Sequence, residues 1–484
     1  MKKTAYVFAA ILILASFLRL VRLTGIPCGF YCDEAAEGYT AYSILTTGKD
    51  FGGNTLPVFV KHIADEIHGG IYSYGMIPSI AVFGLNEFAV RLSSAFWGIL
   101  TVLVLFLLVR KALDTETALL SMLFLAVSPW HMHFSRIGFG AIIYPLFLVL
   151  ALFLFYKGLE KEKYMYFSAA VFALSVYTYS TARVFTPLLV LGLLVFHFRD
   201  FIRNKKSLLV SIAVFALFLI PFAVWFLAGR EELMRRYSIM SIFAFYKDPA
   251  SALKRFVTNM LSYYSPSFLF LSGDPVLRHC VKGFGELYLF TFPLVIYGIF
   301  LCIRERKPFH KVLLYWLLIF PVPASLTVGH RHALRAFTGA PAFQILSAIG
   351  LSGISGLAKK TKGKVKKFVV IPVLSIYIVV SFVNISAYMR EYFIKYKLYS
   401  YRDWEAGFGD AIKYASSIKD AYAYVYLTRY DEALDMLTAF HVKYPPAVYQ
   451  KSGMKNSGYR FANYAEDIRK DFCTRGEKAL YVVK

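Results

Sequence analysis

The sequence predicts an α-helical polytopic membrane protein with about 11 transmembrane helices and a small C-terminal α/β domain. Composition is the first reason: 58% of the 484 residues are hydrophobic and only 17% are charged, whereas about 25% of a soluble chain is charged. The second reason is that apolar runs, close to the roughly 20 residues that a helix needs to cross a bilayer, recur as far as residue 387. Beyond that point these runs stop and the charge rises.

The first apolar span covers 5–22 and follows Lys2 and Lys3, as the apolar part of a signal peptide would. It lacks a clean small-residue cleavage site and continues into Arg19 and Arg22, so we interpret it as a retained helix. The later spans are similarly apolar and are expected at 86–108, 114–129, 141–156, 164–180, 183–198, 207–227, 286–303, 312–328, 336–357 and 368–387.

The loops between these spans predict the orientation of the chain. Basic clusters such as R-D-F-I-R-N-K-K (199–206) and K-K-T-K-G-K-V-K-K (359–367) all fall on one face, which the positive-inside rule makes cytoplasmic. We therefore expect a multi-pass protein of the cytoplasmic (plasma) membrane with its N-terminus on the cytoplasmic side. We expect a transmembrane domain over 1–387 and an extracytoplasmic α/β domain over 388–484, with short strands at 424–428 and 479–483.

Two outer loops of the transmembrane domain, 25–85 and 228–285, are large enough to carry chemistry. Charged side chains gather at the outer ends of the spans, and the middles carry almost none. A charge at the bilayer centre costs at least ~2.5–3.5 kcal/mol and usually marks an ion pathway or proton relay. The lack of such charges, together with the lack of an obvious internal repeat, argues against a transporter.

The net charge limits the classes of partner, and the cysteines limit the disulfide and zinc sites that the chain can form. A charge of +24 fits basic cytoplasmic loops, anionic lipid headgroups or a phosphorylated substrate. The sequence contains no nucleic-acid-binding module, so we exclude nucleic acid as a partner. The five cysteines lack zinc-finger spacing, and their odd number excludes a fully paired framework. Cys28 and Cys32 could pair in an oxidising compartment.

Acidic residues mark the first outer loop twice. The stretch G-F-Y-C-D-E-A-A-E-G-Y-T (29–40) places Asp33 and Glu34 where the chain leaves the membrane. The stretch K-H-I-A-D-E-I-H-G-G (61–70) holds the second cluster, Asp65 and Glu66, with His62 and His68 close by. Carboxylates and imidazoles can bind a divalent metal, but solvated loop carboxylates near a helix N-terminus explain the same pattern.

The other outer-face segments supply cations. Arg136 ends S-P-W-H-M-H-F-S-R, Arg278 lies in L-S-G-D-P-V-L-R-H, and His332 and Arg335 lie in T-V-G-H-R-H-A-L-R. Arginine side chains match phosphate oxygens with two parallel hydrogen bonds. Contacts with lipid headgroups explain each cluster taken alone. Carboxylates and several arginines at one interface favour a site for a phosphorylated substrate.

Together these segments resemble the GT-C glycosyltransferases, in particular the branch with protein O-mannosyltransferases and lipid A aminoarabinose transferases. The resemblance covers about residues 1–350 and thins in the tail. It is carried by Asp33-Glu34, H-G-G-I-Y-S-Y…F-G-L-N-E-F-A-V-R-L-S-S-A (68–95), S-P-W-H-M-H-F-S-R (128–136), G-D-P-V-L-R-H…G-E-L-Y-L-F (273–290) and H-A-L-R (332–335).

The resemblance implies the GT-C fold and transfer of a sugar from a polyprenyl-phosphate carrier to an acceptor on the outer face. It matches Asp33 to the catalytic acid, with Glu34 beside it to orient Asp33 or the acceptor. It also places His68 near a lysine that faces the donor in relatives.

One departure concerns an acid that many relatives carry a few residues after the S-R of the third outer segment. Gly140 or Ala141 stands there in this chain. If that acid has a role in this chain, we expect Asp65 or Glu66 to supply the carboxylate.

The chemistry agrees with this assignment. A lipid phosphate has a second pKa of ~6 and can leave without a general acid, so one base is enough to take the acceptor's proton. We therefore predict an inverting glycosyltransferase with Asp33 as base. Asp65, Glu66 and His68 would hold a divalent metal or contact the sugar. The predicted phosphate-binding residues are Arg136, Arg278, His332 and Arg335, with Arg335 first because H-A-L-R begins a helix at the interface.

Other functions share parts of this pattern. A lipid-linked glycan polymerase or ligase would use the same face and a lipid carrier. A polysaccharide or lipid transporter would share the spans, and a scaffold of the cell envelope would need none of the acids. The acceptor stays open between protein, lipid and glycan.

Overall fold

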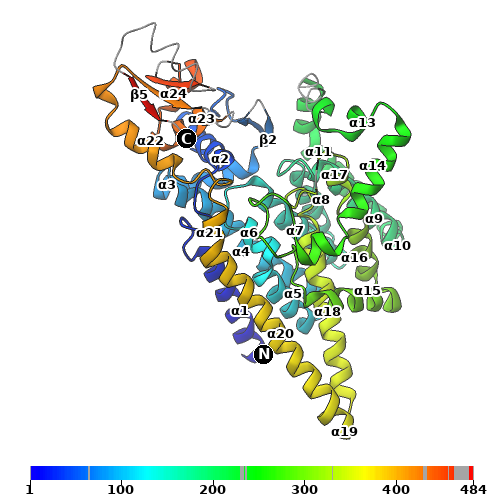
Figure 1. Cartoon of the computed structure of the whole chain (residues 1–484). Helices are drawn as coiled ribbons and strands as arrows, with labels where there is room; N and C mark the ends of the chain where they lie inside the picture. The colour runs from blue at the N-terminus through cyan, green and yellow to red at the C-terminus, as the bar shows by residue number, and fades with distance from the viewer. Residues whose placement is uncertain are drawn as a thin grey trace. The chain divides into compact units, whose positions relative to one another are not determined.

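The computed structural model describes residues 2–63, 66–228, 234, 237–329, 331–428, 433–455, 457–462 and 479–482. They form two compact units (Figure 1). The helical unit comprises Met1–Val21, Ala95–Ser135 and Ala141–Tyr396. The first-loop unit comprises Arg22–Ser94, Arg136–Gly140 and Lys397–Lys484.

The helical unit consists of helices joined by short turns. Helix α4 (Glu87–Ala112) begins in the first-loop unit and continues into this one. The other long helices are α1 (Lys2–Leu20), α5 (Thr115–Val127), α7 (Ile143–Gly158), α8 (Lys163–Ser175), α9 (Ala182–Phe196), α11 (Lys205–Ala228), α14 (Pro249–Ser262), α15 (Thr291–Glu305), α16 (Pro308–Ile319), α18 (Gly339–Lys360) and α20 (Ile371–Arg390). The shorter helices include α6 (Pro129–Phe134), α10 (Phe198–Arg203), α13 (Ile242–Phe245) and α17 (Val322–Ser325).

Small residues allow close packing in the helical unit. Where α15 packs on α18, Gly298 lies against the main chain of Leu346, and Gly350 lies against the main chain of Leu294. A methyl group at either glycine would overlap a carbonyl oxygen of the partner helix. Small residues at helix interfaces are a common basis of packing in membrane proteins. Helix α18 also packs on α5, and α8 packs on both α7 and α11.

Every predicted span coincides with a helix, although 312–328 is split into α16 and α17, with Pro321 at the break. Among the described residues, six helices are long and apolar enough to cross a membrane: Lys2–Leu20, Glu87–Ala112, Gly140–Gly158, Lys205–Ala228, Gly339–Lys360 and Gly363–Tyr399. Helices Ile71–Phe83, Thr115–Val127 and Ala182–Phe196 are apolar but shorter. The chain is a multi-pass membrane protein, and the total of about 11 crossings stays a prediction.

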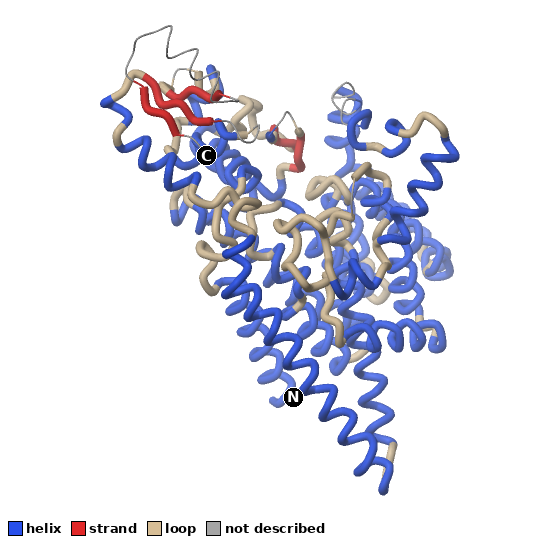
Figure 2. Tube along the Cα trace, in the orientation of Figure 1, coloured by secondary structure: helices blue, strands red, loops and turns tan. Residues whose placement is uncertain are grey.

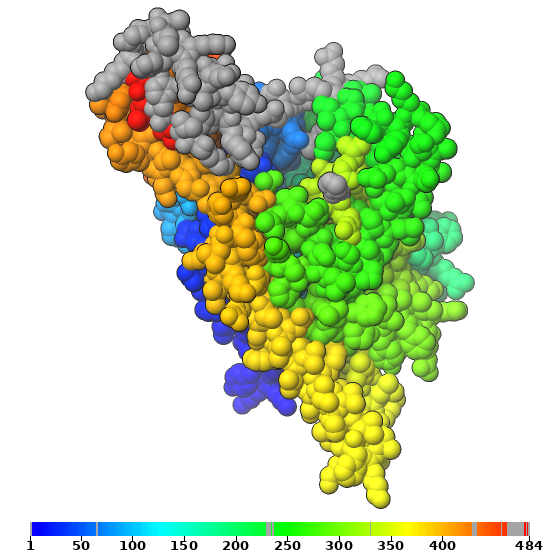
Figure 3. Space-filling model, in the orientation of Figure 1, coloured from blue at the N-terminus to red at the C-terminus, as the bar shows by residue number. Residues whose placement is uncertain are grey.

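The helical segment that contains α20 is exposed over most of its length (yellow to orange in Figure 3). No residue in its most apolar stretch is buried, and large side chains such as Ile378 and Phe382 are exposed. Such a surface suits contact with lipid. Near its C-terminal end, Tyr388, Tyr392 and Tyr396 are buried and stack on one another, which anchors that end to the helical unit.

The first-loop unit is built around α2 (Cys32–Thr47), which packs on α3 (Ile71–Phe83), α23 (Leu434–His441) and α24 (Pro446–Ser452). Helix α2 ends at Gly48, whose φ of 70° is a left-handed conformation that glycine adopts without strain. Between α2 and α3 in the sequence, β1 (Phe59–Lys61) and β2 (Ile67–Gly69) form an antiparallel pair.

A second sheet in this unit has three parallel strands in the order β4-β3-β5 (red in Figure 2). The central strand is β3 (Tyr424–Thr428), and its neighbours are β4 (Tyr459–Ala462) and β5 (Ala479–Val482). Helix α22 (Phe408–Ser417) contacts both β5 and α23. Strands β3 and β5 lie where the sequence predicts them. The domain boundary at residue 387 stays a prediction, and the unit that contains the tail also contains the first loop.

Candidate functional site

The first turn of α2 carries the acidic pair that opens the first loop. Tyr31 precedes the helix with an extended backbone, and its N–H donates to the Glu34 carboxylate at 3.2 Å. Asp33 and Glu34 therefore lie at the positive end of the helix dipole, which stabilises negative charge. Their environments differ, because Asp33 is half-buried and Glu34 is completely buried.

Glu34 is neutralised by Arg91 of α4, which is also completely buried. The Arg91 Nε and Nη2 atoms donate to the two Glu34 carboxylate oxygens at 2.9 and 2.8 Å. The N–H of Gly138 donates to the same carboxylate at 2.7 Å. Glu34 thus holds together three segments of the first-loop unit.

Arg91 also fixes the chain that leads into α2. Its guanidinium donates to the carbonyl oxygens of Pro27 at 2.9 Å and Leu23 at 3.3 Å, and further to those of Thr24 and Gly29. From the tail of the chain, the buried Glu405 carboxylate accepts a hydrogen bond from the Cys32 N–H at 3.0 Å. The backbone on either side of Asp33 is therefore held from two directions.

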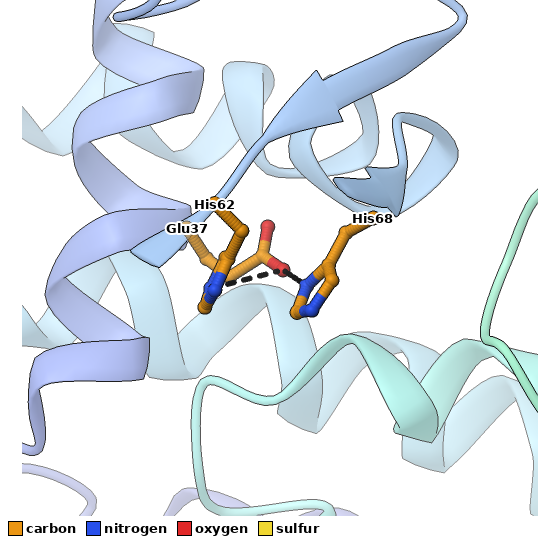
Figure 4. A group of neighbouring side chains, drawn as sticks. All are labelled: Glu37, His62 and His68. Carbon is orange, nitrogen blue, oxygen red and sulfur yellow. Dashed lines mark hydrogen bonds and ion pairs between the residues drawn. The ribbon is translucent and has the colours of Figure 1, made fainter. Parts of the chain in front are cut away.

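One turn beyond Asp33, Glu37 meets two histidines of the β1–β2 region (Figure 4). The Glu37 carboxylate is 3.2 Å from the Nδ1 of His68 and 3.9 Å from the Nε2 of His62. It also accepts a hydrogen bond from the hydroxyl of Ser73 at 2.8 Å. The two imidazole rings stack with their centroids 3.8 Å apart. One carboxylate and two imidazoles with ligand atoms within 4.8 Å of one another form a group that could hold a metal ion.

The predicted metal ligands have different positions in this group. The second ring nitrogen of His68, Nε2, is 3.3 Å from the carboxylate of Glu66. A carboxylate that holds the outer nitrogen of a ligating histidine is a common supporting contact at metal sites. Asp65 lies outside the described residues.

Electrostatics in this group favour a positive charge. Burial alone would lower the pKa of His68, but hydrogen bonds to Glu37 and Glu66 outweigh burial and raise this pKa to about 9. Burial alone would raise the pKa of Glu37, but contacts with His68, His62 and Ser73 outweigh burial and lower it. His68 is thus an imidazolium at neutral pH when no metal is bound, and a bound ion would replace that proton.

The predicted phosphate-binding residues fall in both units. Arg136, in the first-loop unit, is completely buried and donates to the carbonyl oxygens of Ile26 at 3.1 Å and Arg22 at 3.3 Å. These two hydrogen bonds are with the main chain that leads into and begins the first loop. Arg278, His332 and Arg335 belong to the helical unit.

In the helical unit, Arg335 is half-buried and donates to the Thr327 hydroxyl at 2.7 Å. The N–H of His332 donates to the hydroxyl of Tyr263 at 3.1 Å. Burial, together with the neighbouring His279, Arg335 and Arg278, holds the pKa of His332 well below its usual range. Its imidazole is therefore neutral.

Sequence reasoning found part of this arrangement. It grouped Glu66 with His62 and His68 as residues that could bind a metal, but it did not include Glu37 in that group. The spacing of Glu37 could have identified it. Glu37 follows Asp33 by four residues, and residues i and i+4 lie on the same face of a helix. Arg91 and Glu405 carried no local signal, because each is far from its partner in the sequence.

Comparison with solved structures identifies the fold. The chain is similar to ArnT from Cupriavidus metallidurans bound to undecaprenyl phosphate, with a TM-score of 0.58, 12% identity, and coverage of 97% of this chain and 91% of that one. It is also similar to the Archaeoglobus fulgidus oligosaccharyltransferase, with a TM-score of 0.57, 12% identity and coverage of 90% of this chain. The chain spans 64% of the archaeal protein. The fold is that of the GT-C glycosyltransferases.

Sequence comparison points the same way. The model of the family "Dolichyl-phosphate-mannose-protein mannosyltransferase" matches residues 71–225. An uncharacterized protein of Aquifex aeolicus is 30% identical over 181 residues, which are 35% of this chain and 35% of that protein. These findings confirm the resemblance to GT-C glycosyltransferases seen in the sequence.

Proposed function

We propose that the protein transfers a sugar from a polyprenyl-phosphate carrier to an acceptor on the extracytoplasmic face, with inversion at the anomeric carbon and Asp33 as general base. The observation that carries this proposal is the contrast between neighbouring acids in the first turn of α2. Glu34 is buried in an ion pair with Arg91, whereas Asp33 is half-buried. Glu34 then acts as a positioning residue, and Asp33 is the acid that can meet a substrate.

The reaction balances with these groups. Asp33 takes the proton of the acceptor hydroxyl or amine while the acceptor oxygen or nitrogen forms a bond to the anomeric carbon. The bond between that carbon and the phosphate oxygen breaks, and the lipid phosphate leaves with the electron pair. A phosphate whose second pKa is ~6 needs no general acid to depart. Attack opposite to the leaving phosphate inverts the configuration.

Positive charge near the leaving phosphate is the second requirement. Glu37 lies on the same face of α2 as Asp33, four residues further on, so their Cβ atoms are about 5–6 Å apart. A protonated His68, or a divalent ion held by Glu37, His62 and His68, would place positive charge within about one helical turn of the base. The donor set fits such an ion, because two imidazoles and a carboxylate are ligands of first-row metals.

The helical unit contains the other residues that the sequence predicts to bind phosphate. We propose this role for Arg278 and Arg335, with Arg335 as a source of guanidinium donors, and for the neutral imidazole of His332. Arg136 is assigned to positioning of the first loop, because its described hydrogen bonds go to main-chain carbonyls of that loop. The assignment of Asp33 as base depends only on the first-loop unit.

The test measures release of free polyprenyl phosphate. Purified protein in detergent is given a panel of polyprenyl-phosphate monosaccharides and a membrane extract as acceptor, and Asp33→Asn is compared with wild type. Asp410→Asn is the matched control, because Asp410 is an exposed acid in the first turn of α22. We expect Asp33→Asn to slow release by about 10²–10⁴-fold and Asp410→Asn to leave it unchanged.

Two other results would change the proposal. Equal release by Asp33→Asn and wild type would keep the enzyme and remove Asp33 as base. The panel also includes a lipid-diphosphate oligosaccharide, because the fold is similar to that of an oligosaccharyltransferase. Release from that donor alone would favour a glycan ligase. The configuration of the product at its anomeric carbon, measured by NMR, tests inversion.

A further inference from the structure

Two loops of the helical unit, 272–282 and 331–338, bring a carboxylate and two imidazoles together. Asp274, His279 and His332 each offer a ligand atom, and these atoms lie within 4.8 Å of one another. The Asp274 Oδ2 is 3.0 Å from the His279 Nδ1, and the His279 and His332 rings are 4.3 Å apart between centroids. We propose that these side chains form a second metal site, separate from the Glu37 group, for a divalent first-row transition ion with Zn²⁺ as the best match.

The three ligands are held in place by the protein. The Asp274 carboxylate accepts hydrogen bonds from the N–H groups of Val276 at 2.8 Å and Ala333 at 2.6 Å. The second of these bonds joins the two loops. On the other side, the His332 N–H is bound to the Tyr263 hydroxyl. Because both loops are tied to each other and to the unit, little rearrangement is needed for an ion to bind.

One atom of the cluster lacks a partner. The Nδ1 of His332 is buried and has no hydrogen-bond partner among the described residues. A buried polar atom without a partner is unfavourable, and coordination to a metal would satisfy it. Asp274 and His279 are only 3% and 6% exposed, so an ion bound to them would be shielded from water.

The nearby charged groups do not attract a cation. Glu286 is a second buried acid, and its carboxyl group accepts a hydrogen bond from the Asp274 N–H at 3.2 Å. Burial and the neighbouring Asp274 carboxylate raise the pKa of Glu286 well above its usual range, so it adds no negative charge beside the site. Arg278 and Arg335 oppose a cation, since both act electrostatically on His332. An ion here therefore depends on direct coordination by its three ligands rather than on a general negative field.

The ligand types select the ion. Ca²⁺ and Mg²⁺ prefer oxygen ligands, whereas two imidazoles and one carboxylate suit Zn²⁺ and its first-row neighbours. Three protein ligands leave a coordination position open for water or for a substrate group. This site rests on the proposed function in one respect and deepens it, because His332, proposed above to bind phosphate, would do so through the ion; neither Asp33 nor the Glu37 group takes part in it.

The test counts bound zinc. Full-length protein in detergent is stripped with a chelator, incubated with Zn²⁺, passed through gel filtration and analysed by mass spectrometry. His332→Asn removes a ligand of the new site, and His68→Asn removes one of the Glu37 group. His197→Asn is the matched control, because His197 pairs with Asp200 at 2.9 Å but belongs to no three-ligand group among the described residues.

We expect His332→Asn to lose one equivalent of zinc relative to wild type and His197→Asn to lose none. Full retention of zinc by folded His332→Asn would overturn the second site without affecting the Glu37 group. Loss of all zinc in His68→Asn would overturn it as well. Loss in His332→Asn but not in His68→Asn would support the second site and remove the metal from the Glu37 group.

A spectroscopic measurement covers the case in which His332→Asn does not fold. X-ray absorption of the ion that remains in His68→Asn should show two imidazoles in its coordination shell. A shell of oxygen atoms alone would overturn the proposal.

Discussion

Replacement of Arg91 by methionine tests whether the buried ion pair with Glu34 shapes the first turn of α2. In Arg91→Met the Glu34 carboxylate stays buried but loses both guanidinium donors, and it keeps only the N–H groups of Gly138 and Tyr31. The carbonyl oxygens that Arg91 binds before α2 lose a donor in the same step. The variant therefore leaves an uncompensated buried charge next to Asp33.

The size of the effect follows from burial. Both side chains are completely buried and share two hydrogen bonds of 2.9 and 2.8 Å. Removal of one partner of such a pair costs about 3–5 kcal/mol, while replacement of both partners by apolar groups costs much less. We expect Arg91→Met to melt at a clearly lower temperature than wild type. Arg91→Met combined with Glu34→Leu should recover part of the loss.

The assay combines thermal unfolding in detergent with hydrogen exchange of the peptides that cover residues 22–34. Arg110→Met is the matched control, because Arg110 is exposed and lies on the same helix, α4. We expect faster exchange and loss of donor turnover in Arg91→Met and near wild-type behaviour in Arg110→Met. If the two variants show the same melting temperature and the same exchange, the pair does not stabilise the first turn and this reasoning fails.

Three further predictions concern the first-loop unit. In chelator-treated protein, the His68 pKa of about 9 lies above its ordinary value of 6.5, so its contribution to stability is complete below pH 6.5 and is lost as pH rises through about 9. The difference corresponds to about 3 kcal/mol; the hydrogen-exchange protection factors of β1 and β2, which correct for base catalysis of exchange, should fall as pH rises through about 9, and protection factors that do not change with pH would contradict the prediction. Glu405→Ala should lower turnover because the Cys32 N–H loses its acceptor, whereas Glu405→Gln, which retains an acceptor oxygen, should keep most of the activity. Gly29→Ala should lower the melting temperature, because a methyl group there would overlap the carbonyl oxygen of Trp404; Gly356→Ala, where the space is open, is its control, and equal melting of both would refute the close approach.

The helices could be predicted from the sequence because each one depends on local composition. Every apolar span coincides with a helix, and the strands at 424–428 and 479–482 lie where alternating and β-branched residues favour them. The split of 312–328 needed tertiary information, because a proline can either kink a membrane helix or end it.

The site was less predictable because its partners are distant in the sequence. Arg91 is 57 residues from Glu34, and Glu405 is 373 residues from Cys32. No local pattern links such pairs. His68 could be identified as a site residue from its neighbourhood, but its pairing with Glu37 depends on the position of β2 against α2.

The three acids in the first turns of α2 have different environments, and this division favours a particular chemistry. Glu34 is neutralised by a buried arginine, and Glu37 lies between two histidines. Asp33 lies in the first turn of the helix and is half-buried. A carboxylate is a weak base, so it can take a proton from a hydroxyl only as that oxygen begins to bond to carbon. Such a base suffices when the leaving group departs by itself, as a lipid phosphate does, and would not suffice for a sugar alkoxide.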